Sequence, residues 1–224
     1  MNYHTLYQIS NYLNNNKVDI IASLNKYNQG YKNTYLYKPL PLRVHHKNIK
    51  NYLNRNYKLK VYGINTLEEL KQIMNYNVTI IGIEFGLAFN YQISKYDLPK
   101  TLKYIDFGHF FNKNVDNLPE KLRIIKFGAW FNRSVDKLPP AVKFIKFGTD
   151  FNQSVDKLPP TVKFIKFGTI FNQSVDNLPQ SLKILKLICN NFNRSSNKLP
   201  KSLKSIGIYS DFINSNKVIK NVTK

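Results

Sequence analysis

Few side chains in this sequence have the chemistry and the neighbours that catalysis or metal binding requires. The 224 residues include one cysteine and four histidines. His45 and His46 are adjacent, so they point apart in a strand, and no cysteine or acid is near them in sequence to complete a metal site. We interpret Cys189 as a small core residue rather than a nucleophile. The sequence has no glycine-rich phosphate loop and no nucleophile elbow. We therefore predict a protein that is not an enzyme and uses no cofactor or metal.

Positive charge is the second chemical feature. Lysine and arginine total 34 against 13 acids, which gives a formal net charge of +21. Such a charge favours an anionic partner. The stretch from Ile20 to Leu67 has no acid and interleaves basic residues with tyrosines, a pattern typical of nucleic-acid binding. The alternatives are a solvated linker and a lysine content that reflects A/T-rich codons.

The elements that position these charges repeat every 20 residues. Leu-Pro, Phe-Gly and Phe-Asn dipeptides recur in fixed register through most of the chain. The Leu-Pro pairs begin at Leu98, Leu118, Leu138, Leu158, Leu178 and Leu199. One such unit cannot bury its own apolar face, so the units must stack into a continuous core.

Each unit contains one short predicted strand. Leu102, Ile105 and Phe107 have the L-x-x-L-x-L spacing of a leucine-rich repeat. The alternation of side chains in the last part of this pattern predicts that Ile105 and Phe107 face inward. Tyr104 and Asp106 then face outward. The remaining ten or so residues of the unit are too few for a full helix, so we expect extended or 3₁₀ turns there. The predicted fold class is mainly β, a right-handed leucine-rich-repeat-like solenoid of coils with parallel strands, plus a small helical N-terminal cap.

Polar residues also recur at the turns. The asparagine of each Phe-Asn pair is expected to form hydrogen bonds with turn backbone groups. The glycine after the strand is expected to let the backbone turn without a Cβ clash. Aspartates before Leu-Pro are expected to bond nearby turn amides, with a calcium ladder as the alternative. These aspartates are Asp116, Asp136, Asp156 and Asp176. Stacked coils are expected to align these asparagines in a ladder. Four of them, Asn132, Asn152, Asn172 and Asn193, also have the N-x-Ser spacing of glycosylation sites, but the ladder explains their recurrence better.

The recurring pattern Leu-Pro…Leu/Val-Lys-x-Ile-Lys-Phe-Gly-x-x-Phe-Asn-x-Ser-Val resembles the FNIP repeat, a short leucine-rich-repeat-like unit. The resemblance covers about residues 78–214 and is of giant-virus type. It implies a solenoid that binds proteins and has no catalytic activity. The pattern departs at the ends, where Thr79–Phe85 has no Leu-Pro before it and Ile206–Ile208 is followed by Phe212-Ile213.

The N-terminal third follows a different pattern. Apolar residues at helical spacing predict a helical hairpin within residues 1–58, followed by a basic linker. The hairpin resembles a degenerate F-box, which implies docking to a Skp1-like ubiquitin-ligase scaffold. The scaffold-docking candidates are Leu6, Ile9, Tyr12, Leu13 and Ile20. The alternative is a helical cap over the open end of the solenoid.

Residues 59–77 are predicted to bridge the hairpin and the solenoid. Leu59–Ile64 reads as a strand, and Thr66 and Glu69 have the spacing of a capping box at the start of a helix. We assign the solenoid to residues 78–214 and a basic tail to residues 215–224.

The outward strand positions form the candidate partner-binding face. Two cationic columns are predicted to flank an apolar one, an arrangement suited to an acidic partner with apolar side chains. The alternative is that lysine is a polar filler and that Phe144 and Phe164 stack as cross-strand neighbours. The candidate residues are Lys103, Tyr104, Arg123, Ile124, Lys126, Lys143, Phe144, Lys146, Lys163, Phe164, Lys166, Lys183 and Lys186.

The predicted function is a non-catalytic protein-binding scaffold, with the substrate-recruiting arm of a ubiquitin-ligase adaptor as its narrower form. The alternative is a basic repeat protein that binds polyanions or nucleic acid. No apolar run approaches the length of a membrane span, and the N-terminus lacks the order of a signal peptide. We therefore expect no membrane association and an intracellular location in the host cytoplasm.

Overall fold

A computed structural model describes residues 41–53, 56–189, 192–194 and 198–208. The predicted helical hairpin with its scaffold-docking residues, and the basic tail, lie outside the described residues.

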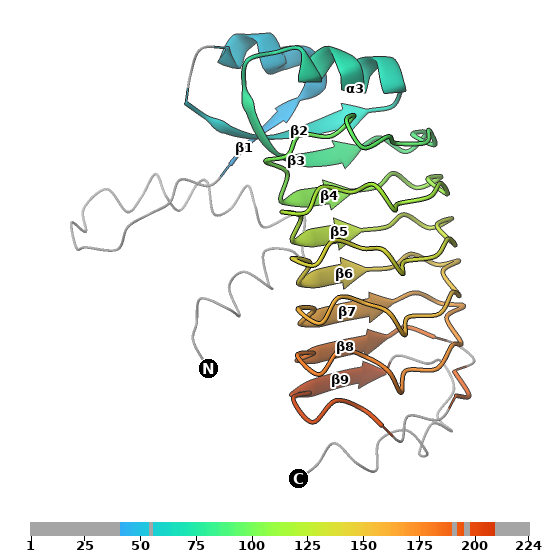
Figure 1. The fold of residues 1–224 in the computed structure, drawn as a ribbon. Helices are drawn as coiled ribbons and strands as arrows, with labels where there is room; N and C mark the ends of the chain where they lie inside the picture. The colour runs from blue at the N-terminus through green and yellow to red at the C-terminus, as the bar shows by residue number, and fades with distance from the viewer. Residues whose placement is uncertain (1–40, 54–55, 190–191, 195–197, 209–224) are drawn as a thin grey trace, which may run out of the picture. The chain divides into compact units, whose positions relative to one another are not determined.

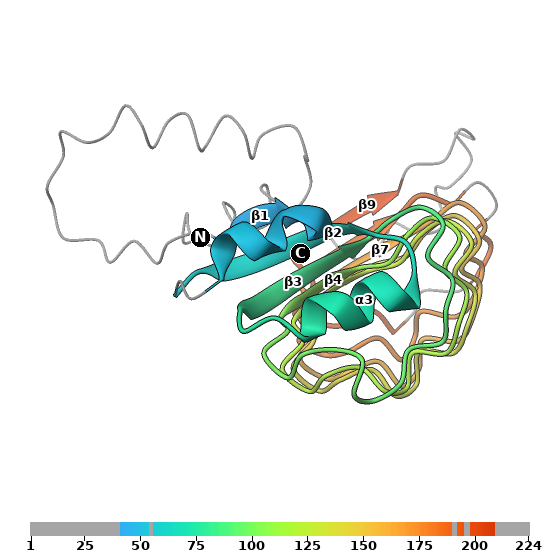
Figure 2. The ribbon, with the colours of Figure 1, turned by 90° about the horizontal axis from the view of Figure 1, so that it is seen from above.

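Nine parallel strands form one sheet, and their order in the sheet is their order in the sequence (Figure 1). The strands are β1 (Leu42–His45), β2 (Lys58–Ile64), β3 (Thr79–Phe85), β4 (Tyr104–Asp106), β5 (Ile124–Lys126), β6 (Phe144–Lys146), β7 (Phe164–Phe167), β8 (Ile184–Leu187) and β9 (Ser205–Ile208). Each coil adds one strand to the growing edge of the sheet. Seen along the stack, the coils that follow β3 overlay closely (Figure 2). The predicted mainly β, leucine-rich-repeat-like solenoid is confirmed.

Two short helices lie at the β1 end of the described stack (Figure 1). A 3₁₀ helix, η1, spans His46–Tyr52, and α3 spans Leu67–Met74. Leu70 and Ile73 of α3 are buried in the same apolar cluster as the strands. The capping box is present: the Glu69 amide donates to Thr66 Oγ1 at 3.1 Å, and the Thr66 amide donates to Glu69 Oε2 at 3.3 Å. These two bonds satisfy amides that the first helical turn leaves without a partner.

The sheet begins earlier than the sequence pattern suggested. We assigned residues around 42–52 to a basic linker, but they form β1 and η1, and β1 pairs with β2 through Val44 and Val61. Val44 and Ile49 are buried. Residues 42–45 alternate apolar and basic side chains, so one side of the strand joins the core while the other stays at the surface. The interpretation as a linker was therefore wrong for this segment.

One apolar cluster runs through the whole described array. Ile105 and Phe107 belong to it and Tyr104 and Asp106 do not, as the alternation predicted. Phenylalanines stack from coil to coil, with ring centroids 5.4 Å apart between Phe107 and Phe127. The phenylalanines of the Phe-Asn pairs form a second ladder, with successive rings 6.1 to 6.4 Å apart. Its members are Phe111, Phe131, Phe151, Phe171 and Phe192. Offset stacking adds to the burial that holds successive coils together.

In the described coils after β3, the return limbs contain turns and bends and no helix, as predicted. The asparagine ladder is confirmed along them. Each Phe-Asn asparagine accepts, through its side-chain oxygen, a hydrogen bond from the backbone amide of the equivalent asparagine one coil later. The donor–acceptor pairs are Asn112 to Asn90 at 2.9 Å, Asn132 to Asn112 at 3.1 Å, Asn152 to Asn132 at 3.0 Å, Asn172 to Asn152 at 2.9 Å and Asn193 to Asn172 at 3.2 Å. Backbone amides between coils thereby gain partners that no strand supplies.

The glycines after the strands are required by contact between coils. A Cβ atom on Gly128 would overlap the carbonyl oxygen of Gly108, and Gly148 and Gly168 meet the preceding glycine in the same way. Ile188 replaces the next glycine, and the chain gains one residue in that coil. There the Cys189 thiol donates to the Gly168 carbonyl oxygen at 3.3 Å. Cys189 is buried, which raises its pKa to about 12, so it is a core residue and a poor nucleophile at neutral pH.

The prediction that the aspartates before Leu-Pro bond nearby turn amides is confirmed for Asp176, whose Oδ1 accepts from the Lys198 amide in the next coil at 3.3 Å. Asp116 and Asp156 contact side chains instead. Asp116 Oδ2 lies 3.0 Å from Lys137 Nζ, and Asp156 Oδ1 accepts from Asn177 Nδ2 at 3.1 Å. Each contact reaches a side chain in the next coil. Turn amides are also satisfied by the side chain two residues earlier, as when the Asp136 amide donates to Ser134 Oγ at 3.2 Å.

Candidate functional site: the lysine-rich strand face

The sheet register places the predicted outward residues in three columns. The inner lysine column joins Lys126, Lys146, Lys166 and Lys186, which are direct partners in neighbouring strands. The central column joins Tyr104, Ile124, Phe144, Phe164 and Ile184 in the same way. The edge cationic column lies just before the strands, where each backbone amide donates to the carbonyl of its predecessor at 2.8 to 2.9 Å. Its members are Lys103, Arg123, Lys143, Lys163, Lys183 and Lys204.

The lysines over β6 to β8 form no close ion pairs among the described residues. Among the described residues, no carboxylate oxygen lies within 4.0 Å of a lysine nitrogen in this part of the two cationic columns. The lysines concerned are Lys143, Lys146, Lys163, Lys166, Lys183 and Lys186. Burial lowers the pKa of Lys166, and the neighbouring charges of Lys146 and Lys186 lower it further. An anion placed over this region would relieve that repulsion.

The central column is less exposed than predicted. Phe144 and Phe164 point away from the core cluster but are only 7% and 2% exposed, and their rings stack in parallel with centroids 4.2 Å apart. Tyr104 is 6% exposed. The prediction of an open apolar column was wrong for these three residues. The alternative reading, cross-strand stacking of the two phenylalanines, is confirmed.

The β1 end of the same face carries a mixed-charge cluster. Glu84 Oε2 accepts from Arg43 Nη2 at 2.8 Å, and Glu84 Oε1 lies 2.5 Å from Lys60 Nζ. The Tyr104 hydroxyl donates to Asp106 Oδ2 at 2.9 Å. Lys60 Nζ also lies 3.8 Å from the centre of the Tyr104 ring, a cation–π contact. Two acids thus hold the cations of this end in place.

Lys126 belongs to this cluster rather than to the free cationic surface. Its amine lies 3.6 Å from Asp106 Oδ2, and the residue is 7% exposed. We counted Lys126 among the partner-binding candidates, and its burial and pairing correct that prediction.

The pKa values of the cluster follow from burial and pairing. Burial alone would raise the pKa of Glu84, but Lys60 and Arg43 outweigh it and lower that pKa. Burial raises the pKa of Asp106 despite its pairing with Lys126. Burial also lowers the pKa of Lys60, against the effect of Glu84. Tyr104, buried beside two carboxylates, has a strongly raised pKa and stays a neutral hydrogen-bond donor.

Sequence reasoning missed Arg43, Lys60 and Glu84 as members of one site. They come from β1, β2 and β3, which lie outside the regular repeat and have irregular spacing. Aligning the three strands by their apolar residues would have found the contact between Arg43 and Lys60, which are register partners.

The fold brings an acid to the histidine pair that sequence alone left isolated. His46 Nε2 lies 3.4 Å from Glu69 Oε1, and the rings of His45 and His46 are 4.4 Å apart. Within the described ranges, no group of three or more His, Cys, Asp or Glu side chains is placed to hold a metal ion.

A second exposed feature lies at the corner after the strands. Leu87 is 70% exposed and Trp130 is 53% exposed, and the Trp130 and Phe110 rings meet edge to face at 4.6 Å. These residues occupy the two positions between Phe-Gly and Phe-Asn, which vary from unit to unit. That variation is the sequence signal that could have marked these positions as exposed.

The comparisons with known proteins agree with this geometry. Residues 131–170 match the family model described as FNIP Repeat. This segment consists of FNIP repeats. Its two units contain β6 and β7, and the same motifs continue into the neighbouring coils.

A solved structure shares the fold. CroV588, a protein of the giant virus CroV whose structure is described as a novel circular LRR protein, is 27% identical, with a TM-score of 0.50. The match covers 69% of this chain and 31% of CroV588, so the chain spans about a third of that protein's length. The curated proteins include no match. The likeness of FNIP repeats to leucine-rich repeats and the viral type of the array are both supported.

No helix in the described part of the chain combines the length and the apolar composition needed to cross a membrane.

Proposed function

We propose that this chain is a non-catalytic scaffold that binds an acidic protein partner through the lysine-rich strand face. The observation that carries the proposal is the run of six lysines over β6 to β8 with no carboxylate within 4.0 Å among the described residues. Six like charges on one face repel one another, and an acidic surface offsets that repulsion. The repeat fold supplies a rigid support for such a face.

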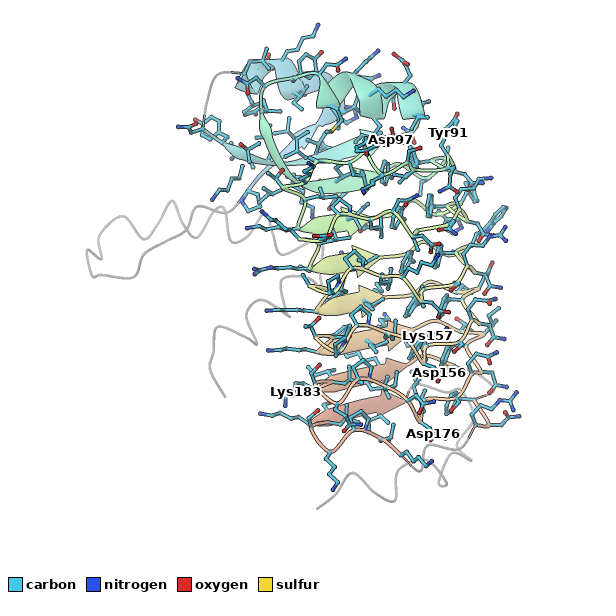
Figure 3. The ribbon with its side chains drawn as sticks, in the orientation of Figure 1. Tyr91, Asp97, Asp156, Lys157, Asp176 and Lys183 are labelled. Carbon is cyan, nitrogen blue, oxygen red and sulfur yellow. The ribbon has the colours of Figure 1, made fainter. Side chains whose placement is uncertain are left out.

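The return limbs provide the contrast within the same coils. Their exposed lysines are interleaved with aspartates, as in the pair of Lys157 and Asp136 at 3.5 Å. Figure 3 shows Lys183 on a different edge of the array from Asp156, Lys157 and Asp176. Lysine excess alone therefore does not explain the strand face, because the same composition yields paired charges elsewhere.

The test is an affinity capture from host-cell lysate, with and without nuclease treatment, followed by mass spectrometry. The variant is Lys146→Gln with Lys166→Gln, and its matched control is Lys137→Gln with Lys157→Gln on the return limb. We expect the strand-face variant alone to lose the captured proteins, and capture by the parent to weaken with added salt. Equal capture by both variants would refute the proposal. Binding that disappears with nuclease treatment would favour the nucleic-acid alternative.

The narrower form of the proposal is a ubiquitin-ligase adaptor that acts in the host cytoplasm. It is supported by the resemblance of the N-terminal segment to an F-box. Leu13→Glu should then abolish binding of a Skp1-like scaffold while leaving the repeat array folded. If the parent chain does not bind such a scaffold, the adaptor role is excluded and the scaffold proposal stands without it.

A further inference from the structure

We infer that the partner element which fits the lysine-rich strand face is an acidic α-helix lying along the stack, across strands β6 to β8. The inference rests on the proposed function and adds the geometry of the partner. Three features of the face carry it: the spacing of the lysines along the stack, the distance between the two cationic columns, and the position at which the positive charge ends.

The spacing of the lysines matches the pitch of a helix. Lys146, Lys166 and Lys186 are register partners in successive parallel strands, and neighbouring strands in a sheet lie ~4.8 Å apart. An α-helix advances ~5.4 Å per turn, so a helix with one acid per turn drifts from the lysines by only ~0.6 Å per coil. The flexible lysine side chain absorbs that drift.

An extended peptide fits the same column less well. Side chains on one side of an extended chain recur every ~6.6 Å, so an acidic strand laid along the stack drifts by ~1.8 Å per coil. Over the two spacings from β6 to β8 the mismatch grows to ~3.6 Å, most of one ~4.8 Å spacing of the lysine column, against ~1.2 Å for the helix. A single acid per turn of helix therefore stays in step with the lysines, and alternate acids in an extended chain do not.

The two cationic columns are separated by about the width of a helix. Lys143 and Lys146 are three residues apart in one coil, which corresponds to at most about 10 Å of extended chain. A helix with its side chains is ~10–12 Å across. A helix laid between the columns thus presents one acidic stripe to Lys143, Lys163 and Lys183 and a second stripe to the inner lysine column.

The mixed-charge cluster sets one end of the helix. In the inner lysine column, the register partner of Lys126 in β4 is Asp106, and the partner of Asp106 in β3 is Glu84. The column is therefore acidic at this end, and Asp106 is paired with Lys126. An acidic helix gains nothing by extending over this end, because its cations already have carboxylate partners. The stretch from β6 to β8, which lacks close ion pairs among the described residues, spans two strand spacings, and with the reach of Lys204 it accommodates about three helical turns.

The experiment measures binding of three synthetic peptides of identical composition to the full-length chain. The first is an alanine-rich helix with one glutamate per turn in each of two stripes that flank one face. The second has the same glutamates spread evenly around the helix. The third has them in the striped order with two prolines at its centre, which break the helix, whereas the first two peptides have the same two prolines at their N-terminal end. Circular dichroism checks that the first two are equally helical and that the third is not.

The expected result is that the striped helix binds about tenfold more tightly than either of the other peptides. Lys146→Gln with Lys166→Gln should weaken that binding about fivefold, the effect of two exposed ion pairs, while Lys137→Gln with Lys157→Gln should leave it unchanged.

Two results would refute the inference of a helical partner while leaving the proposed function intact. Equal binding of all three peptides would show that charge alone is recognised. Capture of an acidic protein through the strand face, with no preference for the striped peptide, would place the partner in another conformation. A single-stranded oligonucleotide that binds more tightly than the striped helix, and competes with lysate proteins, would overturn both the helix and the proposed function.

Discussion

The two ends of one strand face handle charge in opposite ways. Around β1 to β5, Glu84 and Asp106 hold Arg43, Lys60 and Lys126 in ion pairs. Over β6 to β8 the equivalent positions are lysines with no carboxylate oxygen within 4.0 Å among the described residues. Both ends stand on the same parallel sheet and the same apolar core, so the difference lies in which side chains share a column. An internally balanced end stabilises the fold, and an unbalanced end is left to a partner.

The strongest test of this comparison removes the acid at the balanced end. Glu84→Gln leaves the partly buried Lys60 without its carboxylate partner and also removes the partner of the exposed Arg43, and we expect it to destabilise the chain by ~2–4 kcal/mol. Chemical denaturation of parent and variant measures the change. Glu120→Gln, at an exposed turn, is the control and should cost less than ~0.5 kcal/mol. Equal stability of the two variants would mean that the cluster contributes nothing to the fold.

Removing one hydrogen bond of the asparagine ladder should cause a smaller loss of stability, and the loss should be the same at the two ends. Asn152→Ala leaves the Asn172 amide without its partner, and Asn112→Ala does the same to the Asn132 amide. Each should lower stability by ~1–2 kcal/mol, and thermal melts against Asn117→Ala as control measure it. A cost that differs clearly between the two positions would show that coil packing, and not only charge, distinguishes the ends.

The balanced end should also confer a specific pH dependence. The pKa of Glu84 is lowered in the fold, so its stabilisation is present above the ordinary glutamate value of 4.5 and is lost as pH falls through the lower folded value. The raised pKa of Asp106 acts in the opposite sense, since its contribution declines as pH rises through that value.

Stability curves of parent and Glu84→Gln between neutral and acidic pH check this expectation. The parent should lose more stability than the variant below pH 4.5, so that the two curves converge. Parallel curves throughout that range would contradict it.

The smallest effect is expected at the unbalanced end. Lys146→Gln with Lys166→Gln removes repulsion and should change stability by no more than ~0.5 kcal/mol, in the stabilising direction at low salt. Denaturation at low and high salt measures it, and the gain should vanish at high salt because the parent's repulsion is screened. A loss above ~1 kcal/mol would mean that these lysines have a structural role and would blur the contrast between the ends.

The repeat itself determined most of the array. Because the central units are each 20 residues long and parallel strands pair in register, equal positions in successive units become neighbours. That rule placed Ile105 and Phe107 inside, aligned the lysine columns and formed the asparagine ladder. These features follow from spacing along the chain, which a sequence shows directly.

Other features depended on contacts that no period specifies. β1 and β2 precede the repeat, and the register between β2 and β3 shifts at Leu59/Lys60 and at Tyr62/Ile64, so the meeting of Arg43, Lys60 and Glu84 needed the fold. The stacking of Phe144 on Phe164 decided that these two residues of the outward central column are buried. The glycine after each strand was correctly marked as special, but only the stacked coils show that the reason is the carbonyl of the coil before it. Sequence spacing fixes which residues are neighbours, whereas burial and charge pairing depend on distances that only packed coils define.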